Sequence, residues 1–431
     1  MHNVKILDID GITLLYEFVD TNNEFCLSTF FKTGAFTEDD TNSGITHFLE
    51  HMFAKQTKTR SEKDILNFLK LYLPKYNAFT SFDKMVLLYN TSVRHIDKVF
   101  EFAGDVLINS VFTDQRAEKE CNVIEQEISM YEVDNGARAS EELLKTIYKY
   151  PFAQNGILGT RQSVLSTRGA QLTARYNELA CKENVILSFA GNASEEQVVE
   201  LVKKHFSSLP SKPSSKFKTP DIQLNGEQKV VIHKKPKDKA CTVIMCTKFN
   251  FDSKDMMQVL YGNLLSQYLN GQGHPMWNKL REEKSLVYTF QVYKSYMGDS
   301  TTLNFAFETN KENISECIST YSDVLKNLYD KGISQLYFDE LIEAQKTVID
   351  GMFRKPISAT TNAKAYYKGE DFFDRDAVLE ALDKATLKDF MEFYKTRIYS
   401  DFVALSAVGN VNKSDIQSIK ELQALFTKKQ K

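Results

Sequence analysis

Apolar residues follow two different periods along the first half of the chain. They alternate with polar residues on either side of Asp10-Gly11, which predicts a β-hairpin over residues 4–19. Further on, apolar residues recur every three or four positions over residues 43–54, 61–73 and 96–109, so these segments are predicted as helices. A chain that mixes the two periods in this way is expected to have an α+β fold.

Shorter signals complete the pattern of the first half. Strands are predicted over residues 78–81 and 85–92, and a long helical stretch over residues 114–148 carries a break near Asn135-Gly136. Ser61, with Asp64 three residues later, resembles a capping box that begins a helix. This order of strands and helices predicts an α/β sandwich with a mostly antiparallel sheet and helices on one face.

The same order recurs in the second half of the chain. The run "VILSFAGN" ends at Asn192 and "VALSAVGN" ends at Asn410, so the two copies are 218 residues apart (410 − 192). Between them, "SSLPSKPSSKFKTP" combines proline, serine and lysine as linkers do. We therefore predict an N-terminal domain over residues 1–206, a linker over residues 207–220 and a homologous C-terminal domain over residues 221–431.

Composition narrows the classes of protein that remain. The chain has 431 residues, 42% of them hydrophobic, and a net charge of −3, which gives no reason to expect a nucleic-acid partner. No window approaches the length of a membrane span, and the first residues lack the pattern of a targeting segment. The 6 cysteines are scattered and form no CxxC pair. This usage favours a reducing compartment, and we expect a bacterial cytoplasmic protein.

The stretch "THFLEHM" carries the candidate chemistry. His47 and His51 are four residues apart, so on a helix both side chains lie on one face and can bind one ion. Glu50 lies on the same side, where it can accept a proton from water at a zinc site. Surface charges, a helix pair without a function and a structural metal site are the alternatives. A structural zinc site usually includes cysteine, and no cysteine is near in the sequence.

A third ligand is needed for a catalytic zinc site. The helix predicted after residue 114 is rich in acids, and its Glu120 and Glu127 are seven residues apart, which aligns them along one face. One of them can bind zinc while the other hydrogen-bonds a ligand. Without the two histidines, a solvated acidic helix face would be the preferred interpretation.

These motifs together resemble the pitrilysin and insulysin family of zinc metallopeptidases, which has an inverted HxxEH motif. In that family the third ligand is a glutamate about 76 residues after the second histidine, and here Glu127 follows His51 by 76 residues (127 − 51). The resemblance implies that His47, His51 and Glu127 bind one zinc ion per chain. It also implies that Glu50 is the general base and that Glu120 supports the site.

Two further stretches extend the resemblance. "YNAFTSF" is similar to the edge strand of the family, in which Asn77, Ala78 and Phe79 would pair with an extended substrate. "LNGQGHPMWNKLREEKSLVY" resembles a glycine-rich turn followed by Arg281 and Tyr288, which would contact substrate carbonyls and stabilise the developing oxyanion. The turn retains only Gly271 and Gly273, a departure that leaves the substrate preference open.

The second half contains no HxxEH, so the resemblance implies one zinc site per chain. The chain resembles the short family members, in which two chains form a chamber, so each chain is expected to be half of a clam-like enclosure. We predict a zinc endopeptidase that cleaves peptides or unfolded segments by Glu-assisted attack of zinc-bound water. Its active site would be completed in trans within a homodimer or a heterodimer. The alternatives are a non-catalytic scaffold or peptide-holding paralogue, and a dedicated maturation peptidase for one secreted or modified peptide.

Overall fold

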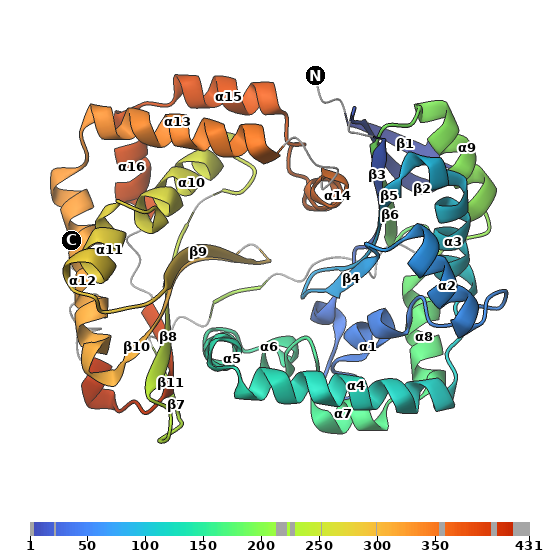
Figure 1. Cartoon of the computed structure of the whole chain (residues 1–431), viewed down its shortest axis with the longest axis horizontal. Helices are drawn as coiled ribbons and strands as arrows, with labels where there is room; N and C mark the ends of the chain where they lie inside the picture. The colour runs from blue at the N-terminus through green and yellow to red at the C-terminus, as the bar shows by residue number, and fades with distance from the viewer. Residues whose placement is uncertain are drawn as a thin grey trace. The chain divides into compact units, whose positions relative to one another are not determined.

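The computed structural model describes residues 4–20, 23–212, 222–224, 229–250, 252–298, 300–352, 358–397 and 403–416. The chain packs into two compact units (Figure 1). Unit 1 consists of residues 1–128, 155–220 and 350–376, and unit 2 consists of residues 129–154, 221–349 and 377–431. Each unit therefore contains a segment from the other half of the chain, residues 350–376 in unit 1 and residues 129–154 in unit 2. The predicted domains, by contrast, were continuous along the sequence. Most of the predicted linker, residues 213–220, lies outside the described residues.

Unit 1 is built on a six-stranded sheet in the order β1-β2-β6-β3-β5-β4. All its strand pairs are antiparallel except the parallel pair β2–β6. The predicted hairpin turns at Asp10 and Gly11, whose φ angles of 53° and 85° suit the tight turns that join twisted strands. The strands are β1 (Lys5–Ile9), β2 (Ile12–Phe18), β3 (Glu24–Phe31), β4 (Asn77–Thr80), β5 (Met85–Ser92) and β6 (Val185–Gly191).

Helices of the first half cover one face of this sheet. Residues that alternate along the strands, such as Leu27 and Phe189, pack with the helices into one large core. The helices of this part of the chain are α1 (Ile45–Met52), α2 (Glu62–Tyr72), α3 (Ile96–Asn109), α4 (Asp114–Val133), α7 (Arg161–Ser166), α8 (Gly169–Leu179) and α9 (Glu195–Phe206). The short helix α6 (Pro151–Asn155) and the end of α4 fall mostly in unit 2. The α+β sandwich predicted from the sequence is confirmed.

The opposite face of the sheet is covered in part by α14 (Ser358–Lys368), which comes from the second half of the chain. Ala363 of this helix packs against a second apolar cluster on the sheet, formed by Leu15, Phe30, Val86 and Ile186. The buried Asn362 amide also donates a hydrogen bond of 2.7 Å to Glu17 of β2. The sequence predicted helices on one face only, and α14 adds a second layer.

Unit 2 repeats the topology of five of the six strands of unit 1, and its described residues form no counterpart of β1. Its order is β7-β11-β8-β10-β9, again with one parallel pair, β7–β11, beside antiparallel ones. The repeated sequence ending in Gly-Asn forms the strand next to the parallel partner in both sheets. The strands are β7 (Val230–Lys234), β8 (Ala240–Lys248), β9 (Phe290–Met297), β10 (Ser300–Asn310) and β11 (Val403–Gly409).

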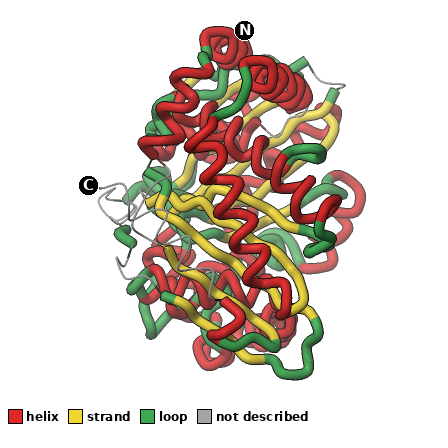
Figure 2. Tube along the Cα trace, turned by 90° about the vertical axis from the view of Figure 1, so that its left-hand side faces the viewer, coloured by secondary structure: helices red, strands yellow, loops and turns green. Residues whose placement is uncertain are grey.

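Helices lie on both faces of this second sheet. On one face, Phe305 of β10 stacks on Tyr321 of α12 (Ile314–Lys331) with ring centroids 4.6 Å apart. The other face packs against α5 (Asn135–Ile147), which comes from the first half of the chain. The remaining helices are α10 (Met256–Asn270), α11 (Pro275–Trp277), α12 (Ile314–Lys331), α13 (Gln335–Met352), α15 (Arg375–Lys384) and α16 (Leu387–Arg397). Figure 2 shows strands in yellow running beside helices in red.

The predicted helix signals agree with the structure in detail. Ser61 begins α2 with the capping box, because its hydroxyl accepts from the Asp64 amide and Asp64 accepts from the Ser61 amide. The expected break in the long helix falls at Asp134, which ends α4 and caps α5 through the amide of Ala137. Among the described residues, we find no helix with both the length and the hydropathy needed to cross a membrane.

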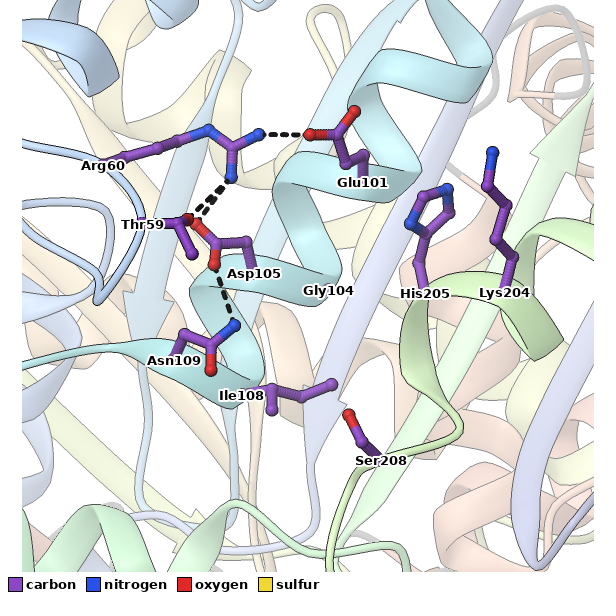
Figure 3. Close-up of a pocket in the computed structure, with 10 residues that line it drawn as sticks. All are labelled: Thr59, Arg60, Glu101, Gly104, Asp105, Ile108, Asn109, Lys204, His205 and Ser208. Carbon is purple, nitrogen blue, oxygen red and sulfur yellow. Dashed lines mark hydrogen bonds and ion pairs between the residues drawn. The ribbon is translucent and has the colours of Figure 1, made fainter.

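An ionic network around the buried Asp105 ties the loop after α1 to α3 (Figure 3). The Arg60 guanidinium donates to Asp105 at 2.6 Å and to Glu101 at 2.7 Å. Asp105 also accepts from the Thr57 hydroxyl at 2.7 Å and from the Asn109 amide at 2.9 Å. A buried carboxylate with this many donors fixes the loop that follows the histidine-bearing helix.

We expect Asp105→Ala to lower the free energy of unfolding by about 2–4 kcal/mol. Asp105 is only 8% exposed, and its removal leaves the donors of Arg60, Thr57 and Asn109 without their acceptor. Urea unfolding followed by circular dichroism measures the change.

Glu101→Ala is the matched control, because Glu101 bonds the same guanidinium from a side chain that is 57% exposed. This control variant should lower the free energy of unfolding by less than about 1 kcal/mol. Burial favours the neutral form of Asp105, but its hydrogen bonds outweigh this and lower its pKa. Its contribution is therefore present above the unfolded pKa and is lost as the pH falls through the folded value. If the two alanine variants were equally stable at neutral pH, this role of Asp105 would be wrong.

Candidate metal centre

The start of α1 is fixed by a buried acid and by two glycines. The Glu38 carboxylate accepts hydrogen bonds from the backbone amides of Gly44 at 2.7 Å and Thr46 at 2.8 Å, and so satisfies the free amides of the first turn. Gly44 has φ +82°, and an added Cβ there would lie 2.4 Å from the carbonyl of Leu158. An added Cβ on Gly159 would likewise lie 2.4 Å from the carbonyl oxygen of Ser43. The histidine-bearing helix therefore begins at a defined position.

The two histidines lie on one face of α1, as their spacing predicts. Their ring centroids are 4.6 Å apart, and His47 is 6% exposed. Burial and the neighbouring His51 lower the pKa of His47 to about 4, so its imidazole is neutral at neutral pH. A neutral imidazole has a free ring nitrogen for a metal ion.

Glu127 of α4 faces both rings. Its Oε2 lies 3.7 Å from His47 Nε2 and 3.4 Å from His51 Nε2. The three ligand atoms lie within 4.8 Å of one another, the only group of this kind among the described residues. Donor atoms around a tetrahedral zinc ion lie roughly 3.3–3.5 Å apart, so these side chains fit zinc with little movement.

Glu120 supports this group from two helical turns earlier on α4. Its Oε1 lies 3.0 Å from His51 Nδ1, so the carboxylate accepts the N–H of that nitrogen and leaves Nε2 for a metal. The Lys55 ammonium lies 3.3 Å from the other carboxylate oxygen of Glu120. Ala54, just before it, has φ 54°, which turns the chain at the end of α1.

The carboxylates of Glu120 and Glu127 favour a positive charge at this site. Burial works against the charged form of His51, but hydrogen bonds to Glu120 and Glu127 raise its pKa to about 9. The hydrogen bond from His51 lowers the pKa of Glu127. Burial favours the neutral form of Glu120, but its contacts with His51 and Lys55 lower its pKa. Two ionised acids at one end of a histidine pair suit a divalent cation.

Glu50 lies beside the group but is not one of the three ligands. Its Oε2 accepts a hydrogen bond of 2.9 Å from the Thr80 hydroxyl, and burial raises its pKa. A carboxylate with a raised pKa is a stronger base than an ordinary surface glutamate, which suits it to accept a proton. Glu50 therefore lies next to the ligand group, while its role as a general base stays a prediction.

Asn77, Ala78 and Phe79 lie on β4, the last strand in the sheet of unit 1. Ala78 packs against the large core and Phe79 against the cluster on the other face, so their side chains anchor the strand from both sides. Within the described chain, β4 pairs only with β5, which leaves its second edge open to an extended peptide. Thr80 at the end of β4 links this edge to Glu50.

Arg281 and Tyr288 lie together in unit 2. The Arg281 guanidinium carbon is 5.6 Å from the centre of the Tyr288 ring, and the Tyr288 side chain is 84% exposed. Arg281 belongs to a short π-helical turn over Asn278–Glu283. The structure places these two predicted residues next to each other, and both belong to unit 2.

Three residues of the centre give no clear signal in the sequence. Thr80 contacts Glu50, Lys55 contacts Glu120, and Glu38 caps α1. Thr80 lies within the stretch "YNAFTSF", but the sequence predicted no role for any of the three. Lys55 comes three residues after the end of α1, so helical spacing does not indicate its contact with Glu120. The cleft of 440 Å³ drawn in Figure 3 contains none of the predicted site residues.

Comparison with known proteins gives the family. Residues 19–161 match the insulinase domain of peptidase family M16, and residues 169–345 match the domain described as the inactive domain of that family. The chain is a member of peptidase family M16, as the resemblance in the sequence predicted.

Similar proteins include zinc proteases from bacteria. An uncharacterised zinc protease of Rickettsia bellii is 24% identical over 417 residues, which cover 94% of this chain and 97% of the relative. The uncharacterised zinc protease YmxG of Bacillus subtilis is 25% identical over 347 residues, covering 78% and 81%. The beta subunit of the mitochondrial-processing peptidase of Bos taurus is 26% identical over 208 residues, covering 46% and 42%.

Solved structures share the fold. A protease from Helicobacter pylori superposes with a TM-score of 0.84 at 17% identity, over 95% of this chain and 100% of that one. The periplasmic protease PqqL of Escherichia coli gives 0.81 at 15% identity, over 100% of this chain and 51% of that one. This chain therefore corresponds in fold to about half of the longer protein.

Proposed function

We propose that the protein is a zinc-dependent endopeptidase whose metal is held by His47, His51 and Glu127. The observation that carries this proposal is the grouping of their ligand atoms within 4.8 Å, with the Glu50 carboxylate beside them and outside the group. Three protein ligands and a separate acid are the usual composition of a catalytic zinc site, whereas a structural site closes all four positions. The names of the bacterial relatives, which are zinc proteases, support the choice of metal.

The chain's own residues then have distinct tasks. Zinc, when bound, supplies a Lewis acid that polarises the scissile carbonyl and makes water acidic. Glu50 accepts the proton of the attacking water and passes it to the leaving amine as the C–N bond breaks. The Thr80 hydroxyl holds the Glu50 carboxylate in place, and the open edge of β4 binds the backbone of an extended peptide.

Arg281 and Tyr288 are proposed to contact substrate carbonyls and to stabilise the developing oxyanion. In a dimer with a second copy or a related chain, each chain would offer them to the metal centre of its partner. The proposal is supported by the second unit, which repeats five strands of the first sheet but holds no such metal group in its described residues. An active monomer, identified by size exclusion with light scattering, would contradict this arrangement.

Two alternatives use the same fold. A non-catalytic paralogue would hold peptides without cleaving them, and the match of the second half to an inactive domain fits such a role for that half. A dedicated maturation peptidase would share the chemistry proposed here but act on one precursor. A cytoplasmic location is proposed from the cysteines alone, all of which are buried and free.

The purified chain is expected to contain one zinc ion and to cleave a quenched fluorescent peptide library. A chelator should abolish the cleavage, and added zinc should restore it, because the ligands belong to a preformed site. Elemental analysis and the peptide assay give the two readouts. A chain that binds stoichiometric zinc but cleaves no peptide would favour the peptide-holding alternative, and a chain without zinc would contradict the proposed zinc peptidase.

A further inference from the structure

The Arg281 guanidinium lies close to two aromatic rings. Its guanidinium carbon is 4.4 Å from the ring centre of Trp277 and 5.6 Å from that of Tyr288. Both distances fall within the range of cation–π attraction, and tryptophan is the strongest partner for it. Trp277 is also the only tryptophan among the 431 residues of the chain. The sequence motif includes Arg281 and Tyr288 and assigns no role to Trp277.

Among the described residues, the Arg281 guanidinium contacts aromatic rings and has no polar partner. Within the part of the chain that the structure describes, its N–H groups make no hydrogen bond or ion pair. The nearest acid in sequence, Glu282, instead accepts a hydrogen bond of 3.0 Å from the Trp277 indole N–H. A guanidinium that lies over aromatic rings still has N–H groups available for oxygen acceptors.

Trp277 is itself held firmly by the fold. It ends α11, where Pro275 occupies the first turn, and its neighbour Met276 is buried. The ring of Trp277 also lies 6.3 Å from that of Phe290 on β9. The turn that follows is π-helical, a rare form that is frequent at functional sites and that shifts the side chains after it.

We infer that Trp277 is a positioning residue for the proposed peptidase: it holds the Arg281 guanidinium so that its N–H edge faces the oxygen atoms of a bound peptide. A flexible arginine would lose rotamer freedom on binding, and the stack removes part of that cost in advance. This inference rests on the proposed function for its substrate, a peptide backbone. The stack itself is a property of unit 2 and is testable without any activity.

Fluorescence of the single tryptophan tests the stack. Arg281→Met should change the emission of Trp277 and increase its quenching by acrylamide, because one face of the indole loses its cover. Arg281→Lys should give an intermediate result, since it keeps the charge and loses the planar fork. Spectra of both variants that match the parent would overturn the inference, whether or not the protein cleaves peptides.

Peptide kinetics test the positioning role. Trp277→Leu should raise the KM for a quenched peptide about fivefold, as expected for the loss of one cation–π contact, with a smaller change in kcat. Trp277→Phe keeps an aromatic face and should recover most of the loss. The matched control is Tyr131→Leu, which removes an aromatic side chain that is 51% exposed on α4. Circular dichroism melting confirms that each variant is folded.

The outcomes separate this inference from the proposed function. Equal KM values for Trp277→Leu and Tyr131→Leu, or for Trp277→Leu and Trp277→Phe, would overturn the positioning role while leaving the peptidase intact. If the parent chain cleaves no peptide, the proposed function fails. A peptide titration followed by Trp277 fluorescence then tests whether the Trp277–Arg281 pair contacts a bound peptide. A saturable change that Arg281→Met abolishes supports the inference, and no change overturns it.

Discussion

Glu50→Gln is expected to reduce the rate of peptide hydrolysis by about 10²–10⁴-fold while leaving zinc bound. Glutamine keeps the shape of the side chain and can still contact the Thr80 hydroxyl, but it cannot accept a proton from water at neutral pH. Zinc should remain because Glu50 is not one of the three clustered ligands. Kinetics with a quenched peptide and elemental analysis of the same preparation give both values.

Glu125→Gln provides the control for Glu50→Gln, since Glu125 lies on α4 with its side chain 39% exposed and contacts Arg161 of α7. It should leave hydrolysis within about twofold of the parent, because a surface ion pair contributes little. Undiminished hydrolysis by a clean preparation of Glu50→Gln would show that another group accepts the proton.

Glu127→Ala is expected to remove zinc and with it all measurable hydrolysis. The carboxylate supplies one of three ligand atoms, and Glu127 Oε2 is the only acidic oxygen in the group. Loss of a ligand leaves two imidazoles, which hold zinc much more weakly than three donors. Zinc content after dialysis against buffer, together with the peptide assay, measures the result.

Glu120→Gln gives the informative contrast to Glu127→Ala. Glu120 touches His51 Nδ1 and not the metal-facing nitrogen, so the variant should weaken zinc affinity by about 10–100-fold without abolishing it. Competition with a chromogenic chelator measures that affinity. If Glu127→Ala kept stoichiometric zinc and Glu120→Gln lost it, the assignment of the two acids would have to be exchanged.

Much of the metal centre was predictable because its parts obey helical spacing. His47 and His51 lie one turn apart, and Glu120 and Glu127 two turns apart, so the spacing alone places each pair on one face of its helix. The approach of α4 to α1 depended on the family resemblance, because residues 76 positions apart (127 − 51) carry no periodic signal. The structure confirms that the three predicted ligands gather, while their binding of zinc stays a prediction.

Other features were not predictable because they depend on tertiary packing. The contact of Thr80 with Glu50 joins a strand end to a helix, and an ordinary threonine in a strand gives no sign of it. The packing of α14 against the first sheet has no signal in the sequence, because the helix shows only the usual amphipathic pattern and its partner strands lie far away along the chain. The stack on Arg281 was likewise outside the sequence pattern.

Because α14 belongs to unit 1, the packing of this unit can be completed only after α14 has been synthesised. The helix that covers one apolar cluster of the first sheet begins only at Ser358. The sheet that carries β4 therefore stays partly uncovered after residue 220 has been made. The cluster consists of Leu15, Phe30, Val86 and Ile186. At ordinary rates of translation, the residues still to be added take on the order of ten seconds to make. During that time the histidine-bearing half of a nascent chain lacks part of its packing, and it becomes complete only when most of the second half exists.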